Sequence, residues 1–305
     1  MMTMTTTTTT TRTTTKAISP RTDPVAAVAI VVTIFAWASA FPAIRAGLAA
    51  FGPLELGAVR FAIAAIPAAI YLAVTRPKLP GRGDLWRFGI GGFGFVALYT
   101  GLLNYGELTV SAGAASFIIN ISPILTALFA TAYLGERFSA IAWAGTLLSF
   151  AGIGIIALGE GEGLRFDGGA LFILGAAFVT AINAIVQKPL FARHNPLAVA
   201  AWNMVIGALA LSPFLPAGLQ QAAVADAHGL FAVVYLGIVP SLIAYASWAV
   251  ALSRLPASRA SNFLYCVPPV ATLMGFLWLG EEPGLLGVAG GALALIGVAI
   301  VNLRR

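Results

Sequence analysis

The residues that could do chemistry in this chain are polar side chains set in the middle of long apolar segments. A polar group in apolar surroundings is costly, so it tends to face a cavity or another helix. As a set, these residues predict a polar-lined cavity that binds a small molecule. For any single one, a hydrogen bond between helices is an equally good interpretation. In chain order they are Ser39, Tyr99, Asn120, Thr180, Asn183, Asn203, Tyr245, Ser261, Asn262 and Tyr265.

Aromatic side chains lie in the same segments and indicate the character of the bound molecule. Aromatic rings stack on an aromatic ligand and attract cations over their faces. The alternative is that the rings face lipid or sit at its border, as expected for Trp86, Trp143 and Trp278 at segment ends. The candidates for binding are Trp37, Phe41, Tyr99, Trp202, Tyr245 and Trp248.

No pattern in the sequence predicts catalysis, a metal or a bound cofactor. The single cysteine, Cys266, excludes an internal disulfide and a thiolate cluster. Neither His194 nor His228 has a second histidine four residues away, and no phosphate-binding G-x-x-x-x-G-K-[ST] loop is present. We therefore expect no enzyme activity, no catalytic or metal-binding residues and no cofactor.

Arg60 is the only basic residue well inside an apolar segment. A guanidinium in that position must pair with an acid or extend to the membrane surface. Glu55, five residues earlier, is the favoured structural partner, and the carboxylate of a bound molecule is the alternative.

The elements that carry these residues are membrane-spanning helices. Of the 305 residues, 59% are apolar and 9% are charged, and the mean hydropathy is +0.93. A water-soluble domain carries about 25% charged residues, so a soluble enzyme is excluded. Each helical span needs about 20 apolar residues. The ten apolar segments cover residues 25–45, 53–74, 85–106, 112–133, 140–158, 168–188, 196–215, 230–252, 257–279 and 284–303.

The segment before the first span, residues 1–22, is rich in Thr and has no apolar period. Such a segment cannot bury enough surface to offset the entropy of ordering, so we expect a disordered tail. The remaining chain divides into two five-helix halves, residues 23–160 and 161–305.

Lys and Arg predict the orientation. With a cytoplasmic amino terminus, 14 of the 17 basic residues fall on the cytoplasmic side, and only Arg45, Arg60 and Arg165 do not. This bias places both termini in the cytoplasm. Because orientation explains the positive charge, no nucleic-acid partner is expected.

The chain repeats itself. Residues 112–156 align without gaps onto residues 257–301, with 13 of 45 positions identical. Pro53 and Arg45 match Pro196 and Lys188 at an offset of 143. Because five spans is an odd number, the two copies must enter the membrane in opposite directions. Inverted repeats of this kind are typical of secondary transporters, which bind substrate where the halves meet. A duplication kept only for packing is the alternative.

Pro123 and Pro268 occupy equivalent positions in the fourth and ninth spans. A proline removes one backbone hydrogen bond and weakens the helix locally. The pair therefore predicts two hinges, with a static kink as the alternative.

The repeated motif resembles a known family. Small residues and a serine precede a proline, followed by Leu-Gly-Glu and a glycine-spaced helix, in both halves. The motif stands as Ala115-Ser116, Pro123, Leu134-Gly135-Glu136, Gly145 and Gly152, and again as Ala260-Ser261, Pro268, Leu279-Gly280-Glu281, Gly290 and Gly297. It is similar to the EamA domain of the drug/metabolite transporter superfamily, and among its members to exporters of aromatic amino acids.

The resemblance implies an all-α integral membrane protein of ten helices that exports small metabolites by alternating access. The favoured substrates are aromatic or hydrophobic amino acids, carried across the bacterial inner membrane by a monomer without an ATPase subunit. Other amphiphiles, such as cationic drugs or other amino acids, and a channel-like facilitator or lipid scramblase are the alternatives. Because no segment centre supplies a titratable carboxylate, we expect transport down the substrate gradient.

Overall fold

The computed structural model describes residues 23–110, 112–159, 168–279 and 284–303. The Thr-rich segment 1–22, the expected boundary at 160/161 and the second motif at Gly280-Glu281 lie outside the described residues. Within the described part of the chain, every regular element is a helix.

Three helices, α1, α10 and α12, begin at a residue whose side chain caps the helix start. The side chain of Asp23 accepts from the backbone N of Val25 at 3.0 Å and starts the first helix, whose first residue is Pro24. Asn195 does the same for Leu197 at 2.9 Å, ahead of Pro196. The first half comprises α1 (Pro24–Ala38), α2 (Ala40–Leu48), α3 (Pro53–Thr75), α4 (Leu85–Gly89), η1 (Ile90–Leu98), α5 (Tyr99–Gly106), α6 (Ala112–Ile119), α7 (Ser122–Tyr133) and α8 (Ala140–Gly159).

The second half has the same order of long helices with one addition. Helix α11 occupies a stretch that was expected to be mostly loop. The elements are α9 (Gly168–Gln187), η2 (Lys188–Ala192), α10 (Pro196–Leu211), η3 (Ser212–Phe214), α11 (Leu215–Val224), α12 (Ala227–Leu236), η4 (Gly237–Ile243), α13 (Ala244–Arg254), α14 (Ala257–Asn262), η5 (Phe263–Cys266), α15 (Val267–Leu279) and α16 (Leu285–Leu303).

Among the described residues, eight helices are long and apolar enough to cross a membrane. The expected segments 85–106 and 257–279 are not among the eight. Both are helical, but they are divided into shorter elements and carry polar residues such as Asn104 and Asn262. A helical membrane protein is therefore confirmed, and the count of ten spans stays a prediction. The eight run over Pro24–Leu48, Pro53–Thr75, Ala114–Tyr133, Ala140–Leu158, Gly168–Ala192, Pro196–Val224, Ala227–Arg254 and Leu285–Asn302.

Interruptions of the helices recur at matching places in the two halves. The π-helical segments η1 and η4 coincide at an offset of 145 residues. Asn120 and Ile121 separate α6 from α7, and the 3₁₀ segment η5 separates α14 from α15 at the same offset. Pro123 and Pro268 each lie at the second position of the helix that resumes. Because proline has no N–H to donate, the backbone pattern changes just before it.

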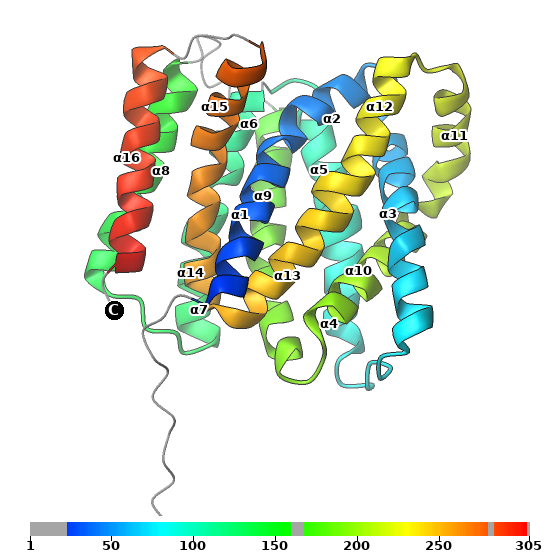
Figure 1. Cartoon of the computed structure of the whole chain (residues 1–305), viewed down its shortest axis with the longest axis horizontal. Coiled ribbons are helices and arrows are strands. Elements are labelled where there is room, and N and C mark those ends of the chain that lie inside the picture. The colour runs from blue at the N-terminus through cyan, green and yellow to red at the C-terminus, as the bar shows by residue number, and fades with distance from the viewer. Residues whose placement is uncertain (1–22, 111, 160–167, 280–283, 304–305) are drawn as a thin grey trace, which may run out of the picture.

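Helices α8 and α16 pack directly on each other at one side of the molecule (Figure 1). A Cβ at Gly152 would lie 2.6 Å from the carbonyl oxygen of Gly290, and one at Gly297 would lie 2.4 Å from that of Gly145. Ser149 adds a 2.9 Å hydrogen bond to the carbonyl of Ala294. The glycines therefore allow the backbones to approach closely, which agrees with the packing role expected from their spacing.

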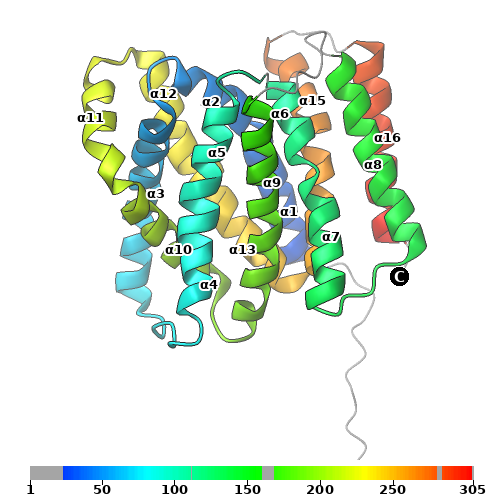
Figure 2. The same ribbon diagram turned by 180° about the vertical axis from the view of Figure 1, so that it is seen from behind.

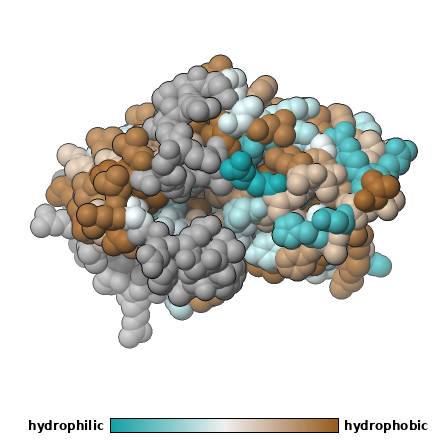
Figure 3. All heavy atoms as spheres, turned by 90° about the horizontal axis from the view of Figure 1, so that it is seen from above, coloured by the Kyte–Doolittle hydropathy of each residue, from teal (hydrophilic) through white to brown (hydrophobic). Residues whose placement is uncertain are grey.

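The rest of the bundle has two layers around its centre. Helix α1 packs against α13 and α15 on one side (Figure 1), and α9 packs between α5 and α7 on the other (Figure 2). The first residue of α1 and the last of α16 lie on the same face, called the terminal face below (Figure 1). The opposite face is hollowed near its middle, with hydrophilic residues beside the hollow (Figure 3).

Candidate functional site

A cavity lies between the two layers and encloses about 620 Å³ of empty space, its open mouth included. Both halves of the chain contribute. The lining residues are Trp37, Ala40, Phe41, Ile44, Arg60, Phe95, Tyr99, Leu103, Ile119, Asn120, Ser122, Thr180, Tyr245, Leu264 and Val267.

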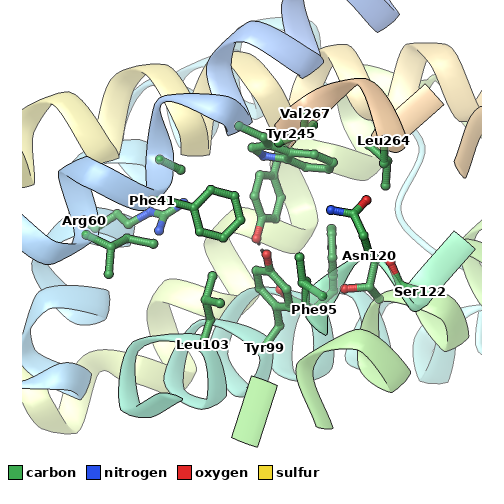
Figure 4. A pocket seen from close by; sticks show the side chains of 15 residues that line it. Phe41, Arg60, Phe95, Tyr99, Leu103, Asn120, Ser122, Tyr245, Leu264 and Val267 are labelled. Atoms are coloured by element: carbon green, nitrogen blue, oxygen red, sulfur yellow. Dashed lines mark hydrogen bonds between the residues drawn. The ribbon is translucent and has the colours of Figure 1, made fainter. Parts of the chain in front are cut away.

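Aromatic rings form the centre of the cavity wall. The ring of Tyr245 on α13 lies 5.0 Å from that of Phe95, and the ring of Phe95 lies 5.3 Å from that of Tyr99. Trp37 meets Tyr245 edge-on at 6.0 Å, and its indole N–H donates to the carbonyl of Pro240 at 3.2 Å. The hydroxyls of Tyr99 and Tyr245 point toward one another (Figure 4). This wall suits a flat apolar or aromatic ligand.

Arg60 lies at one end of the row of rings, next to Phe41 (Figure 4). Its side chain is 3% exposed, and its Nε donates to the hydroxyl of Ser241 at 2.5 Å. The expected pair with Glu55 is not formed: the ion pairs of the described residues join Arg193 and His194 to Asp84, and Arg254 to Asp23. Arg60 instead reaches Ser241, which η4 supplies where it packs on α3.

Asn120 and Ser122 lie at the other end of the cavity (Figure 4). The break between α6 and α7 places them there, because Asn120 has left the helix and Ser122 begins the next one. The amide of Asn120 donates to the carbonyl of Ser116 at 2.7 Å. Thr180 on α9 lines the same cavity and donates to the carbonyl of Ala176.

Of the residues predicted to bind substrate, those that line the cavity are Trp37, Phe41, Tyr99, Asn120, Thr180 and Tyr245. Two others support its wall from behind. Ser39 accepts a hydrogen bond from Tyr235 at 2.7 Å, and the ring of Trp248 lies 5.5 Å from that of Trp37.

The remaining predicted residues lie elsewhere in the bundle. Asn262 accepts from Thr146 at 2.8 Å, and Tyr265 is fully buried against Ile153 and Ala294. The adjacent Ser261 is also buried.

Asn183, Trp202 and Asn203 lie on α9 and α10, the two helices that pack on η1. The amide of Asn203 donates to the side-chain oxygen of Gln187 at 3.0 Å, and Gln187 donates to the carbonyl of Arg87. The side-chain oxygens of Asn183 and Asn203 and the indole N–H of Trp202 have no hydrogen-bond partner.

Side-chain contacts join neighbouring elements on the terminal face. The carboxylate of Glu136 accepts from the backbone N–H groups of Ala257 and Ser258 at 2.7 and 3.0 Å, at the start of α14. Lys188 donates to the carbonyls of Leu252 and Leu255 at the end of α13. Glu136, from the first Leu-Gly-Glu motif, thus ties α7 to the second half. Lys188 caps the carboxyl end of α13.

Glu107 is a residue that sequence reasoning missed, because it lies just beyond the apolar segment 85–106. It follows α5 directly, its side chain is 3% exposed, and neither carboxylate oxygen has a hydrogen-bond partner. Burial raises its pKa well above the usual value, and the charges of Arg45 and Arg60 oppose this shift. Glu107 lies beyond the end of α5 and not at a segment centre, so transport down the substrate gradient stays a prediction.

Sequence reasoning also passed over Phe95, Leu103 and Ser122 as cavity residues. Phe95 and Leu103 are ordinary apolar residues of a span, so their type gave no signal. Ser122, directly before Pro123 in the matched motif, was a signal that could have been used.

The comparisons with known proteins agree with this geometry. The model of the EamA-like transporter family matches residues 24–158 and 167–303. A protein of Streptantibioticus cattleyicolor named "Probable terminal-alkyne amino-acid exporter" is 39% identical over 90% of this chain and 93% of its own length. An uncharacterised transporter of Bacillus subtilis is 34% identical over 88% of each chain.

Two matches of lower sequence identity also cover most of the chain. A protein of Salmonella typhimurium named "Probable amino-acid metabolite efflux pump" is 27% identical over 88% of this chain and 92% of its own. A solved structure with 22% identity superposes with a TM-score of 0.74 over 92% of this chain and 98% of that one, which shows a shared fold. Together with the apolar helices, these findings make the protein a multi-pass inner-membrane transporter of small molecules, and not an enzyme.

Proposed function

The chain belongs to the EamA-like transporter family, and from this membership we propose that it exports amino acids with aromatic or hydrophobic side chains. The observation that carries the proposal is the central cavity, whose wall includes Trp37, Phe41, Phe95, Tyr99 and Tyr245. These rings favour an apolar or aromatic side chain over a polar one. The names of the relatives from Streptantibioticus cattleyicolor and Salmonella typhimurium, which refer to amino-acid export, support the same class.

The architecture we propose is ten membrane-spanning helices in two inverted five-helix repeats, with both termini in the cytoplasm. The double match of the family model and the π-helical segments at corresponding places support the repeat. Basic residues near the ends of α3, α7 and α13 lie on the terminal face, which supports the orientation (Figure 1).

Transport proceeds in this proposal by alternating access of a monomer. The contacts of Glu136 and Lys188 hold the terminal face closed, while the opposite face is hollowed (Figure 3). Opening toward the cytoplasm requires these contacts to break. Pro123 and Pro268 stand where the fourth and ninth spans are interrupted, so we assign the hinges to these two places.

The test is transport of labelled Phe, Trp and Thr by the purified protein in proteoliposomes. Export of aromatic amino acids predicts saturable flux of Phe and Trp, competition between them, and little flux of Thr. Flux that is linear in concentration and shows no competition would favour a channel-like facilitator. Movement of labelled lipid between the two leaflets, without amino-acid flux, would favour a scramblase.

A further inference from the structure

The charge in the cavity wall is positive. Arg60 is the only charged side chain among its lining residues. Burying a cation without a nearby anion is costly, so such a group in a native structure needs an explanation. No ion pair of the described residues includes Arg60.

Only one of the three guanidinium nitrogens of Arg60 makes a hydrogen bond to the described residues. Nε donates to Ser241, which is itself held by a 2.8 Å hydrogen bond to the carbonyl of Leu236 within the π-helical segment. Beside it, the ring of Phe61 has its centroid 5.2 Å from the guanidinium carbon. These contacts fix the orientation of the group, and its two terminal nitrogens make no hydrogen bond to the described residues. A fixed guanidinium with two free N–H edges is suited to a carboxylate, which it binds with two parallel hydrogen bonds.

The other charged side chains near Arg60 do not neutralise its charge by pairing with it. The charge of Glu107, directly after α5, acts on Arg60, but among the described residues the two form no ion pair. Arg45 on α2 has an exposed side chain and adds positive charge. Between Arg60 and Asn120 the cavity is lined by aromatic rings, which suit an apolar body on the side away from the charge (Figure 4).

We propose that Arg60 binds the carboxylate of the transported molecule. The inference rests on the proposed export function and narrows it: the substrates are carboxylates with an aromatic or apolar body. Cationic amphiphiles are excluded, because the cavity would bring two positive charges together in a medium that screens them weakly.

The experiment compares two probes that differ only in this group. The thermal midpoint of the purified protein in detergent is titrated with 3-phenylpropionate and with 3-phenylpropanamide. The acid is expected to stabilise the protein, with an apparent affinity about tenfold or more above that of the amide. Equal stabilisation by the two probes, or none by either, overturns the assignment of Arg60.

Variants then locate the effect. Arg60→Gln is expected to remove the preference for the acid, and Arg60→Lys to restore part of it. Arg45→Gln, at an exposed arginine of the neighbouring helix, is the control and should keep the full preference. If Arg60→Gln does not fold, Arg60→Lys locates the effect: a weaker preference for the acid than in the natural protein supports the assignment, and an unchanged preference overturns it.

Flux of labelled Phe is measured separately, so that the two proposals can fail independently. Saturable Phe flux together with equal binding of acid and amide leaves the export function standing and removes the role of Arg60. Selective binding of the acid without Phe flux leaves the role of Arg60 in carboxylate binding standing and removes the export function.

Discussion

Arg60 and Asn203 occupy corresponding positions in the two halves, 143 residues apart, yet their surroundings differ. Around both, a glycine of a π-helical segment lets two helices cross closely. A Cβ at Gly237 would lie 2.9 Å from the carbonyl oxygen of Arg60, and one at Gly92 would lie 3.0 Å from that of Asn203. The backbone arrangement is thus the same at the two crossings.

The side chains lead to different chemistry. Arg60 reaches Ser241 and lines the open cavity. Asn203 pairs with Gln187 in a closed contact, where a Cβ at Gly91 would lie 2.4 Å from its side-chain oxygen. The two halves therefore share this helix crossing, while the residue at one position, Arg60 or Asn203, decides which of the two sites holds a charge. Four predictions test this contrast.

The largest effect is expected from Asn203→Arg, which puts the cation of the first half into the second. Among the described residues, the hydrogen-bond partners of Asn203 and Gln187 include no acid, so the new charge would be buried without a partner. We expect a loss of about 3–5 kcal/mol in unfolding free energy, measured as a lower thermal midpoint in detergent. Gln220→Arg, at an exposed position of α11, is the control. A midpoint equal to that of the natural protein would show that the second site is as open as the first.

The two glycine crossings should be equally intolerant of a side chain. Gly92→Ala and Gly237→Ala each place a Cβ within 3.0 Å of a backbone oxygen and against an isoleucine. We expect each to cost about 1–3 kcal/mol of stability. Gly94→Ala, in the same π-helical segment as Gly92, is the matched control, because its nearest neighbour is at an ordinary 3.7 Å. A large difference between the first two variants would contradict the shared crossing.

The stability of the protein should depend on pH through Glu107, which lies in the same half as Arg60. Because burial raises the pKa of Glu107, the folded state holds its proton to higher pH than the unfolded state does. Stability should therefore fall as the pH rises above about 4.5, by at most about 1.4 kcal/mol per pH unit.

Glu107→Gln should remove most of this slope in thermal midpoints measured between pH 5 and 8. Glu55→Gln, at a partly exposed acid near the start of α3, should leave the slope unchanged. An unchanged slope in Glu107→Gln would refute the assignment.

The smallest effect is expected from Gln187→Leu, which removes the partner of Asn203. Hydrogen bonds between helices in membranes contribute about 0.6 kcal/mol on average, so stability should fall slightly. Preference for 3-phenylpropionate over its amide should stay as in the natural protein, since Gln187 is not a lining residue of the cavity. A loss of preference comparable to that of Arg60→Gln would mean that the contact of Asn203 with Gln187 also determines binding in the cavity.

The sequence by itself determined the class of the molecule. Composition and apolar segment length require membrane-spanning helices, and caps such as Asp23 and Asn195 set the helix starts. These properties depend on neighbouring residues along one chain segment, so they can be read locally. The matched motif around Pro123 and Pro268 also marked the places where the helices are interrupted.

Which polar residues meet the cavity was decided only by the tertiary structure. Asn120 and Tyr265 are equivalent in the sequence, yet Asn120 lines the cavity and Tyr265 is packed against α8 and α16. Glu55 is closer to Arg60 in the chain than Ser241 is. Arg60 nevertheless bonds to Ser241, because α3 packs on η4. The direction of a side chain depends on the helix that packs beside its own, and that neighbour can lie 181 residues away, as Ser241 does from Arg60.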